Sequence, residues 1–128
     1  MNRVVVTGVG AVTPIGNDIP AFWENALQGK CGIDFITKFD TSDLKVKIAA
    51  EVKDFDPGLY MEKSEIRKTD LYSQYAMAAA VQAVKDSGIE NQVDPERFGV
   101  FVGSGIGGMN TFMQEHQKMM EKGAKRIS

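Results

Sequence analysis

The amino-acid sequence predicts an α/β fold with a mostly parallel sheet, and three observations support this prediction. Two short apolar runs, at residues 3–8 and 98–103, have the length and composition of strands buried on both faces. Helical patterns at residues 18–28, 70–87 and 110–122 alternate with these runs. Two parallel strands cannot bury three apolar helix faces, so we expect the sheet to include strands that lie beyond residue 128.

A loop joins the first expected strand to the first expected helix. Three consecutive valines favour the strand. The chain then turns at Gly8, Gly10, Pro14 and Gly16. Asp18 is suited to cap the helix that follows, and Pro20 lies in the first turn, where a missing N–H costs nothing. Gly29 is a natural stop, so we predict a helix over residues 18–28.

The stretch from residue 30 to residue 61 has no regular hydrophobic period. We expect it to form an insertion that wraps the core of the domain rather than builds it. Within this insertion, the pattern predicts an extended segment at residues 46–52 and a turn at residues 54–57.

A long alanine-rich helix and a shorter helix complete the pattern. Thr69 or Asp70 can cap the long helix, which we predict to run to Ser87 and to close at Gly88. Its alanines allow close packing on several sides. After the second apolar run, apolar side chains recur at helical spacing over residues 110–122, and a glycine ends that helix.

Composition and charge fit one modest soluble domain and exclude several classes of protein. The chain has 128 residues, 43% of them hydrophobic, and a formal net charge of -2, which gives no basic field for nucleic acid or membrane. The longest apolar run, residues 76–81, is too short to span a bilayer, and the N-terminus lacks a signal-peptide layout. A single cysteine fits a reducing cytosol, so we expect a cytoplasmic location.

The glycine-rich run from Gly103 to Gly108 allows three interpretations. It satisfies the dinucleotide pattern G-x-G-x-x-G, between an expected strand and an expected helix. The acidic ribose ligand of such a site would lie about 20 residues further on, beyond residue 128. The loop could instead line an apolar pocket, with Ile106 as a gate beside Met109, or form a plain strand-to-helix turn. The pattern alone leaves the three interpretations open.

Four stretches, in order along the chain, together resemble one known family. They are Arg3-Val-Val-Val-Thr-Gly-Val-Gly continuing through Thr13-Pro-Ile-Gly16, then Phe39-Asp-Thr-Ser42, then Arg67-Lys-Thr-Asp70 leading into Tyr75-Ala76, and finally Gly103-Ser-Gly-Ile-Gly-Gly108 followed by Lys125-Arg-Ile-Ser128. Each motif alone is weak, but the four in this order are specific. The chain resembles the β-ketoacyl-[acyl carrier protein] synthases of the thiolase superfamily and looks closest to their synthase II branch.

The resemblance implies that residues 1–128 are the N-terminal portion of a synthase with a thiolase-like, layered α-β-α-β-α fold. It implies an acyltransferase of fatty acid elongation, in which a cysteine and two histidines carry out a decarboxylative Claisen condensation. Those three residues are expected beyond residue 128, so the chain alone should be inactive. A cytoplasmic homodimer without a metal or nucleotide cofactor is also implied. The apolar stripe of Phe112, Met113 and Met120 would then face the rest of the synthase or its partner subunit.

The same resemblance assigns two sites. The acyl-pocket gate is assigned to Ile106, with its neighbours Gly105, Gly107, Gly108 and Met109. Docking of the acidic acyl carrier protein is assigned to basic residues at matching positions, which are Arg67, Lys68, Lys125, Arg126 and Lys63. Ser64 stands where the family often has a basic residue, which removes or shifts one contact. Without the resemblance, the acidic side chains nearby would favour a solvated, mixed-charge surface.

The remaining reactive residues are expected to have other roles. Cys31 lies where the family has a small residue, and no histidine base is evident beside it, so we expect it to be structural or incidental. His116 is the only histidine, without a cluster of metal ligands, and we expect it to pack partly at an interface. Two alternatives to an enzyme are a nucleotide-binding domain and a non-catalytic module that binds carrier protein.

Overall fold

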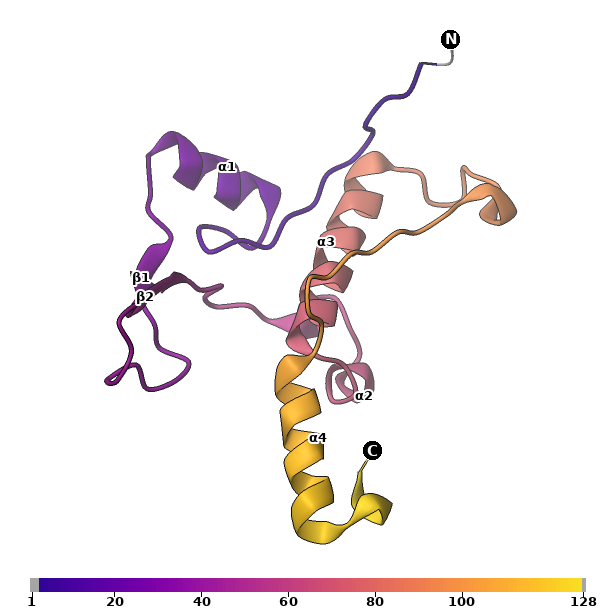
Figure 1. The fold of residues 1–128 in the computed structure, drawn as a ribbon. Coiled ribbons are helices and arrows are strands. Elements are labelled where there is room, and N and C mark those ends of the chain that lie inside the picture. Colours follow the sequence, from indigo (N-terminus) through magenta and orange to yellow (C-terminus); the bar gives the residue numbers. More distant parts are fainter. Residues whose placement is uncertain (1–2, 128) are drawn as a thin grey trace.

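The helix α3, Leu71–Ser87, is the element around which the rest of the chain is arranged (Figure 1). A computed structural model describes residues 3–127, so Ser128, the last residue of the fourth motif, lies outside the described part. The other elements, with η for a 3-10 helix, are α1 Ile19–Leu27, β1 Ile33–Phe35, β2 Ile48–Ala50, η1 Pro57–Leu59, α2 Lys63–Ile66, η2 Pro95–Arg97, α4 Met109–Lys122 and η3 Ala124–Arg126. Figure 1 shows α1 and the small sheet on one side of α3, and α4 extending from the end of α3 that lies near α2.

Local capping explains where α1 begins and ends. The Asp18 carboxylate accepts a hydrogen bond from the Ala21 N–H at 2.8 Å, and Pro20 lies in the first turn. Gly29 follows the helix with a φ of +68°, a left-handed conformation that glycine adopts without steric cost. The predicted helix over residues 18–28 is therefore confirmed, with one residue fewer at each end.

The two later helices are also confirmed. The helix α3 begins after Asp70 and ends at Gly88, which has a left-handed φ of 63°. The helix α4 begins at Met109, one residue earlier than predicted, and Gly123 follows it. The C-terminal boundaries are set by Gly88 and Gly123, directly next to the helices, which explains why the sequence pattern locates them correctly.

The two apolar runs are extended but do not form strands among the described residues. Phe101, in the middle of the second run, is 98% exposed. A strand needs a neighbour to receive its backbone hydrogen bonds, and neither residues 3–8 nor residues 98–103 lie in a sheet here. The sheet formed by the described residues is instead the antiparallel pair β1–β2. The prediction that residues 3–8 and 98–103 form buried strands is therefore wrong for the described residues.

The insert between α1 and α2 contains the small sheet. Ile33 of β1 pairs with Ala50 of β2, so the extended segment predicted at residues 46–52 is confirmed at its centre. The Glu51 carboxylate accepts hydrogen bonds from the Thr37 hydroxyl at 2.8 Å and from the Thr37 N–H at 3.1 Å. These bonds, chiefly the one from the hydroxyl, hold the pKa of Glu51 below its ordinary value.

The loop after the first apolar run packs against α3 through its bare backbone. A Cβ placed on Gly8 would overlap the carbonyl oxygen of Ala83, and one on Gly10 would overlap the carbonyl oxygen of Ala79. Backbone atoms of a helix cannot move aside without breaking its hydrogen bonds, so no larger residue fits at either position. The two glycines therefore allow the loop to lie directly on the helix.

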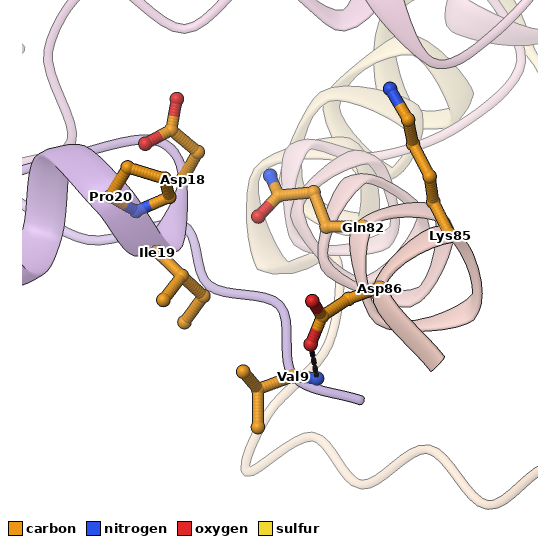
Figure 2. Close-up of a pocket in the computed structure, with 7 residues that line it drawn as sticks. All are labelled: Val9, Asp18, Ile19, Pro20, Gln82, Lys85 and Asp86. Carbon is orange, nitrogen blue, oxygen red and sulfur yellow. Dashed lines mark hydrogen bonds between the residues drawn. The ribbon is translucent and has the colours of Figure 1, made fainter. Parts of the chain in front are cut away.

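Two polar side chains of α3 hold the same loop by hydrogen bonds. The Val9 N–H donates to the Asp86 carboxylate at 2.9 Å, at the edge of a pocket of about 530 Å³ between α1 and α3 (Figure 2). The Ala11 N–H donates to the side-chain oxygen of Gln82 at 3.1 Å, and the Gln82 Nε2 donates to the Asn17 carbonyl at 2.8 Å. The loop is thus fixed to α3 at both of its ends.

Replacing Gln82 with leucine is expected to destabilise the folded protein by about 2 kcal/mol, since a part-buried polar group left without its partner costs about 1–3 kcal/mol. Leucine is similar in size but has neither an acceptor for the Ala11 N–H nor a donor for the Asn17 carbonyl. Chemical denaturation should show a lower midpoint with an unchanged slope. Gln82→Glu keeps the hydrogen-bond acceptor but loses the donor, so its midpoint should lie between those of the wild type and Gln82→Leu. A midpoint for Gln82→Leu equal to that of the wild type would contradict the expectation.

Few side chains of the described residues are buried. On α3, Ala78 has no exposed surface and Gln74 is 8% exposed. On α4, Phe112, Met113 and Met120 are 69%, 61% and 70% exposed. Several large apolar side chains exposed on one helix are typical of a face that binds another structural unit. None of the helices in residues 3–127 has the length and apolar character needed to cross a membrane.

Candidate functional site

The glycine loop presents Ile106 at the surface. Ile106 is 77% exposed, and with Gly108, Met109 and Phe112 it lines a pocket of about 320 Å³. A Cβ placed on Gly105 would meet nothing within 4 Å. The open surroundings leave the Ile106 side chain free to change rotamer, as a gate must. Of the predicted gate residues, Ile106, Gly108 and Met109 therefore line one pocket, and Gly105 and Gly107 lie next to it in the sequence.

Local hydrogen bonds define the turn just after Ile106. The Gly107 N–H donates to the Ser104 hydroxyl at 3.0 Å, and the Met109 N–H donates to the Gly107 carbonyl at 3.1 Å. Gly107 has a φ of +80°, which strains any residue with a side chain. A Cβ on Gly107 would lie 3.9 Å from the Tyr72 ring. The loop thus lies next to the first turn of α3.

The start of α4 is held by a carboxylate from another element. Asp70, the residue just before α3, accepts a hydrogen bond from the hydroxyl of Thr111, in the first turn of α4. A Cβ placed on Gly108 would overlap the same carboxylate, so a larger residue there would displace the Asp70 side chain from its present position. Gly108 is the N-cap of α4 and has no side chain with which to cap it. Asp70 supplies a negative charge at this helix N-terminus instead.

Three of the predicted docking residues lie on α2 and the turn after it. Lys63 begins α2, Arg67 directly follows its last residue, and Lys68 comes next. All three are exposed, and the Lys68 N–H donates to the Glu65 carbonyl at 2.9 Å, which closes the turn. Within residues 3–127, neither Arg67 nor Lys68 forms an ion pair. Their charges are therefore available to an acidic partner.

The basic turn is anchored on α3 by Gln74. This largely buried side chain donates from Nε2 to the carbonyls of Ile66 and Thr69, at 3.0 Å each. The two carbonyls flank Arg67 and Lys68, so the backbone that carries both cations is held from both sides. Sequence analysis missed Gln74, because a single polar residue in an alanine-rich helix does not show which backbone groups it meets.

The other two predicted docking residues, Lys125 and Arg126, lie at the opposite end of α4. Both belong to η3, which packs against α4, and both are exposed. Arg126 lines a surface pocket together with Lys118 and Lys122 of α4, two lysines that sequence analysis did not single out although their i,i+4 spacing places them on one face. No extensive packing joins η3 to α2 in the described residues, so the predicted docking residues form two separate basic groups.

Neither reactive side chain has a catalytic partner in the described residues. Cys31 is exposed, and its Sγ lies 3.8 Å from the Ile33 carbonyl oxygen. His116 stacks on Phe112 in α4, with 6.4 Å between the ring centroids. The sheet next to Cys31 and the helix that carries His116 lie apart in Figure 1. Residues 3–127 also contain no cluster of three or more side chains that could hold a metal ion.

Two known proteins illustrate the sequence similarity of the chain. It is 49% identical over 127 residues to 3-oxoacyl-[acyl-carrier-protein] synthase 2 of Staphylococcus aureus (strain COL), which is 98% of this chain. It is 46% identical over 127 residues to 3-oxoacyl-[acyl-carrier-protein] synthase 2 of Coxiella burnetii (strain RSA 493 / Nine Mile phase I). The chain spans 31% of the length of each of these relatives.

Solved structures give the same result for the fold. One similar structure is the ishigamide ketosynthase/chain length factor, with a TM-score of 0.72 and 28% sequence identity. The match covers 91% of this chain and 29% of the ketosynthase chain. A second is AntDE:AntF, a type II PKS acyl-carrier protein in complex with its ketosynthase bound to the hexaketide. That match covers 100% of this chain and 33% of the matched chain, with a TM-score of 0.78 and 30% sequence identity. The predicted α/β fold, the N-terminal half of a thiolase-like layered fold, is confirmed. The family described as "Beta-ketoacyl synthase, N-terminal domain" matches residues 1–128, and the chain belongs to that family.

Proposed function

We propose that the chain is the N-terminal part of a 3-oxoacyl-[acyl carrier protein] synthase of fatty acid elongation. The observation that carries this proposal is the 49% identity to the Staphylococcus aureus synthase over 98% of the chain. In the proposed reaction, a cysteine thiolate takes an acyl group from its carrier protein. Loss of CO2 from malonyl-carrier protein then gives a carbanion that attacks the thioester carbon, so that a C–C bond forms and the thiolate leaves.

The catalytic cysteine and two histidines of this reaction are expected outside residues 1–128. Cys31 and His116 do not supply them, because they lie on separate parts of the structure and neither has a catalytic partner within residues 3–127. We therefore expect residues 1–128 alone to have no condensing activity. The contribution of this chain to the reaction is to receive the substrate.

Docking of acyl carrier protein is assigned to the exposed basic groups. A carrier protein is acidic, and cations that lack an internal ion pair attract it and increase the encounter rate. Arg67 and Lys68 fulfil this condition in the described residues, with Lys63 close by on α2. Lys125 and Arg126 form the second group. The AntDE:AntF complex supports the assignment, because that ketosynthase binds its acyl-carrier protein.

The condensation assay tests the proposed function directly. The full-length protein, mixed with acyl- and malonyl-loaded carrier protein, is expected to release CO2 and form 3-oxoacyl-carrier protein. Folded full-length protein that releases no CO2 under these conditions would overturn the proposal. Equilibrium binding of NAD(P) provides the contrast with the dinucleotide interpretation of residues 103–108, and we expect none.

The gate hypothesis predicts a change in product length. Ile106→Phe in the full-length synthase should lower the rate with long acyl primers by about tenfold and spare short primers, because added side-chain volume in a packed tunnel costs about 1–3 kcal/mol. The chain-length distribution of the products measures this effect. Ile106→Val keeps the shape of the side chain and should leave the distribution unchanged. A Phe variant whose products match those of the wild type would refute the gate.

A homodimer and a cytoplasmic location complete the proposal. The exposed stripe of Phe112, Met113 and Met120 supports the homodimer, since the remainder of the synthase or a second subunit would cover this surface. The single cysteine supports the cytoplasmic location. No metal or nucleotide cofactor is needed for the chemistry proposed.

A further inference from the structure

A single carboxylate lies where two helices begin. Asp70 is the N-cap residue of α3, yet its side chain makes no capping hydrogen bond to that helix. Its carboxylate instead accepts a hydrogen bond from the hydroxyl of Thr111, in the first turn of α4. The Asp70 carbonyl accepts the Gln74 N–H at 3.1 Å, as the backbone of an N-cap should. Backbone and side chain of one residue therefore serve different helices.

The carboxylate of Asp70 lies against the glycine that precedes α4. Both carboxylate oxygens of Asp70 lie so near Gly108 that a Cβ there would overlap them. Gly108 gives α4 no side-chain cap, and the carboxylate is placed at the N-terminus of a 14-residue helix, where negative charge is stabilising. The start of α4 is therefore positioned by a hydrogen bond and by charge.

The two proposed sites meet at this residue. The basic turn of Arg67 and Lys68 ends at Thr69, and Gln74 fixes it on the first turns of α3. The gate loop lies near the same part of α3, with Gly107 facing the Tyr72 ring. Asp70 comes directly after the docking turn in the chain and directly contacts the element that follows the gate loop. Through its hydrogen bond with Thr111, Asp70 connects the docking turn to the start of α4.

We propose that Asp70 is a positioning residue for the acyl gate, which it holds in place relative to the carrier-docking turn. The inference rests on the proposed function and adds a residue to it. The Asp70 carboxylate keeps the start of α4 in one position, and the Ile106 side chain is carried three residues before the first residue of that helix, Met109. When this hold is lost, the gate no longer stays aligned with the point at which the carrier delivers its acyl chain.

The central test compares two substitutions at Thr111 in the full-length synthase. Thr111→Val removes the hydroxyl and keeps the shape of the side chain, whereas Thr111→Ser keeps the hydroxyl. For Thr111→Val we expect kcat with long acyl primers to fall about tenfold, as for loss of a hydrogen bond to a charged group. The KM for carrier protein should stay within about twofold, because Arg67 and Lys68 are intact. Thr111→Ser should restore kcat.

A second variant and a control make the outcome decisive. Asp70→Asn keeps the size of the side chain and loses its charge, so it should show the same dependence on primer length even if Thr111→Val does not fold. Ser42→Ala removes the hydroxyl that donates to Asp40 in the insert, a matched pair far from the gate loop in sequence, and should behave as wild type.

The outcomes separate this inference from the proposed function. If the wild-type enzyme condenses and Thr111→Val and Asp70→Asn slow short and long primers equally, Asp70 only stabilises the fold and the inference is overturned. Full activity of both variants with every primer would overturn it too, as would failure of Thr111→Ser to recover kcat. If the wild-type enzyme does not condense, the proposed function fails first.

Discussion

Gly10→Val is expected to prevent the N-terminal loop from packing on α3 and to destabilise the full-length synthase by about 3 kcal/mol, the upper part of the range for overpacking. The valine Cβ would overlap the Ala79 carbonyl oxygen and lie 2.8 Å from the Gln82 Cβ. The helix backbone cannot yield, so the loop must move away. Its hydrogen bond from Ala11 to Gln82 would then be lost as well.

Chemical denaturation followed by circular dichroism measures the decrease in the free energy of unfolding. Ala80→Val adds a branched side chain at an exposed position of the same helix and serves as the control, with an expected cost below about 1 kcal/mol. The destabilisation caused by Gly10→Ala should lie between those of Gly10→Val and Ala80→Val, because its single methyl group already meets the helix backbone. An unchanged midpoint for Gly10→Val would show that the loop does not lie on α3 in solution.

Reversing the two charges of the basic turn should weaken recognition of carrier protein without affecting the chemistry. For Arg67→Glu combined with Lys68→Glu, we expect KM for acyl-carrier protein to rise by about tenfold or more, since two attractive contacts become repulsive and tenfold equals about 1.4 kcal/mol. The rise should shrink as salt screens the charges. Rates with a small acyl thioester that lacks the carrier should stay unchanged.

A matched control separates the docking site from net charge. Lys45→Glu combined with Lys47→Glu makes the same change of charge on exposed residues of the insert, and KM should stay within about twofold of wild type. If this control raises KM as much as the change at Arg67 and Lys68, long-range charge explains the effect. Carrier-dependent kinetics that are unaffected by the reversal would eliminate the basic turn as a docking site.

The helices could be predicted from the sequence because their ends are fixed locally. Asp18 caps α1 with its own side chain, and Gly88 ends α3 in a left-handed conformation that few other residues adopt. The strands could not be predicted in the same way. Residues 3–8 and 98–103 have the composition of buried strands, but pairing depends on neighbours that no local pattern specifies.

The candidate site was only partly predictable. The resemblance identified the Ile106 loop and the basic residues separately, with Asp70 considered as a possible cap for α3 and as a nearby negative charge. Its contact with Thr111 joins residues 41 positions apart, so the tertiary fold decides it. The same holds for Gln74, whose two acceptors lie across a turn.

The unpaired state of residues 3–8 and 98–103 also has a consequence for biosynthesis. Among the described residues, the second run presents exposed apolar side chains and backbone groups without strand partners, as an open sheet edge does. While this part of the chain leaves the ribosome, α3 can form early from hydrogen bonds that are local in sequence, whereas its contacts with the N-terminal loop join residues 71 and 77 positions apart. We expect their strand partners beyond residue 128, so the two runs would have to wait until that part is made. We therefore expect the nascent synthase to depend on chaperones during that interval, in which its strands are open to mispairing with other chains.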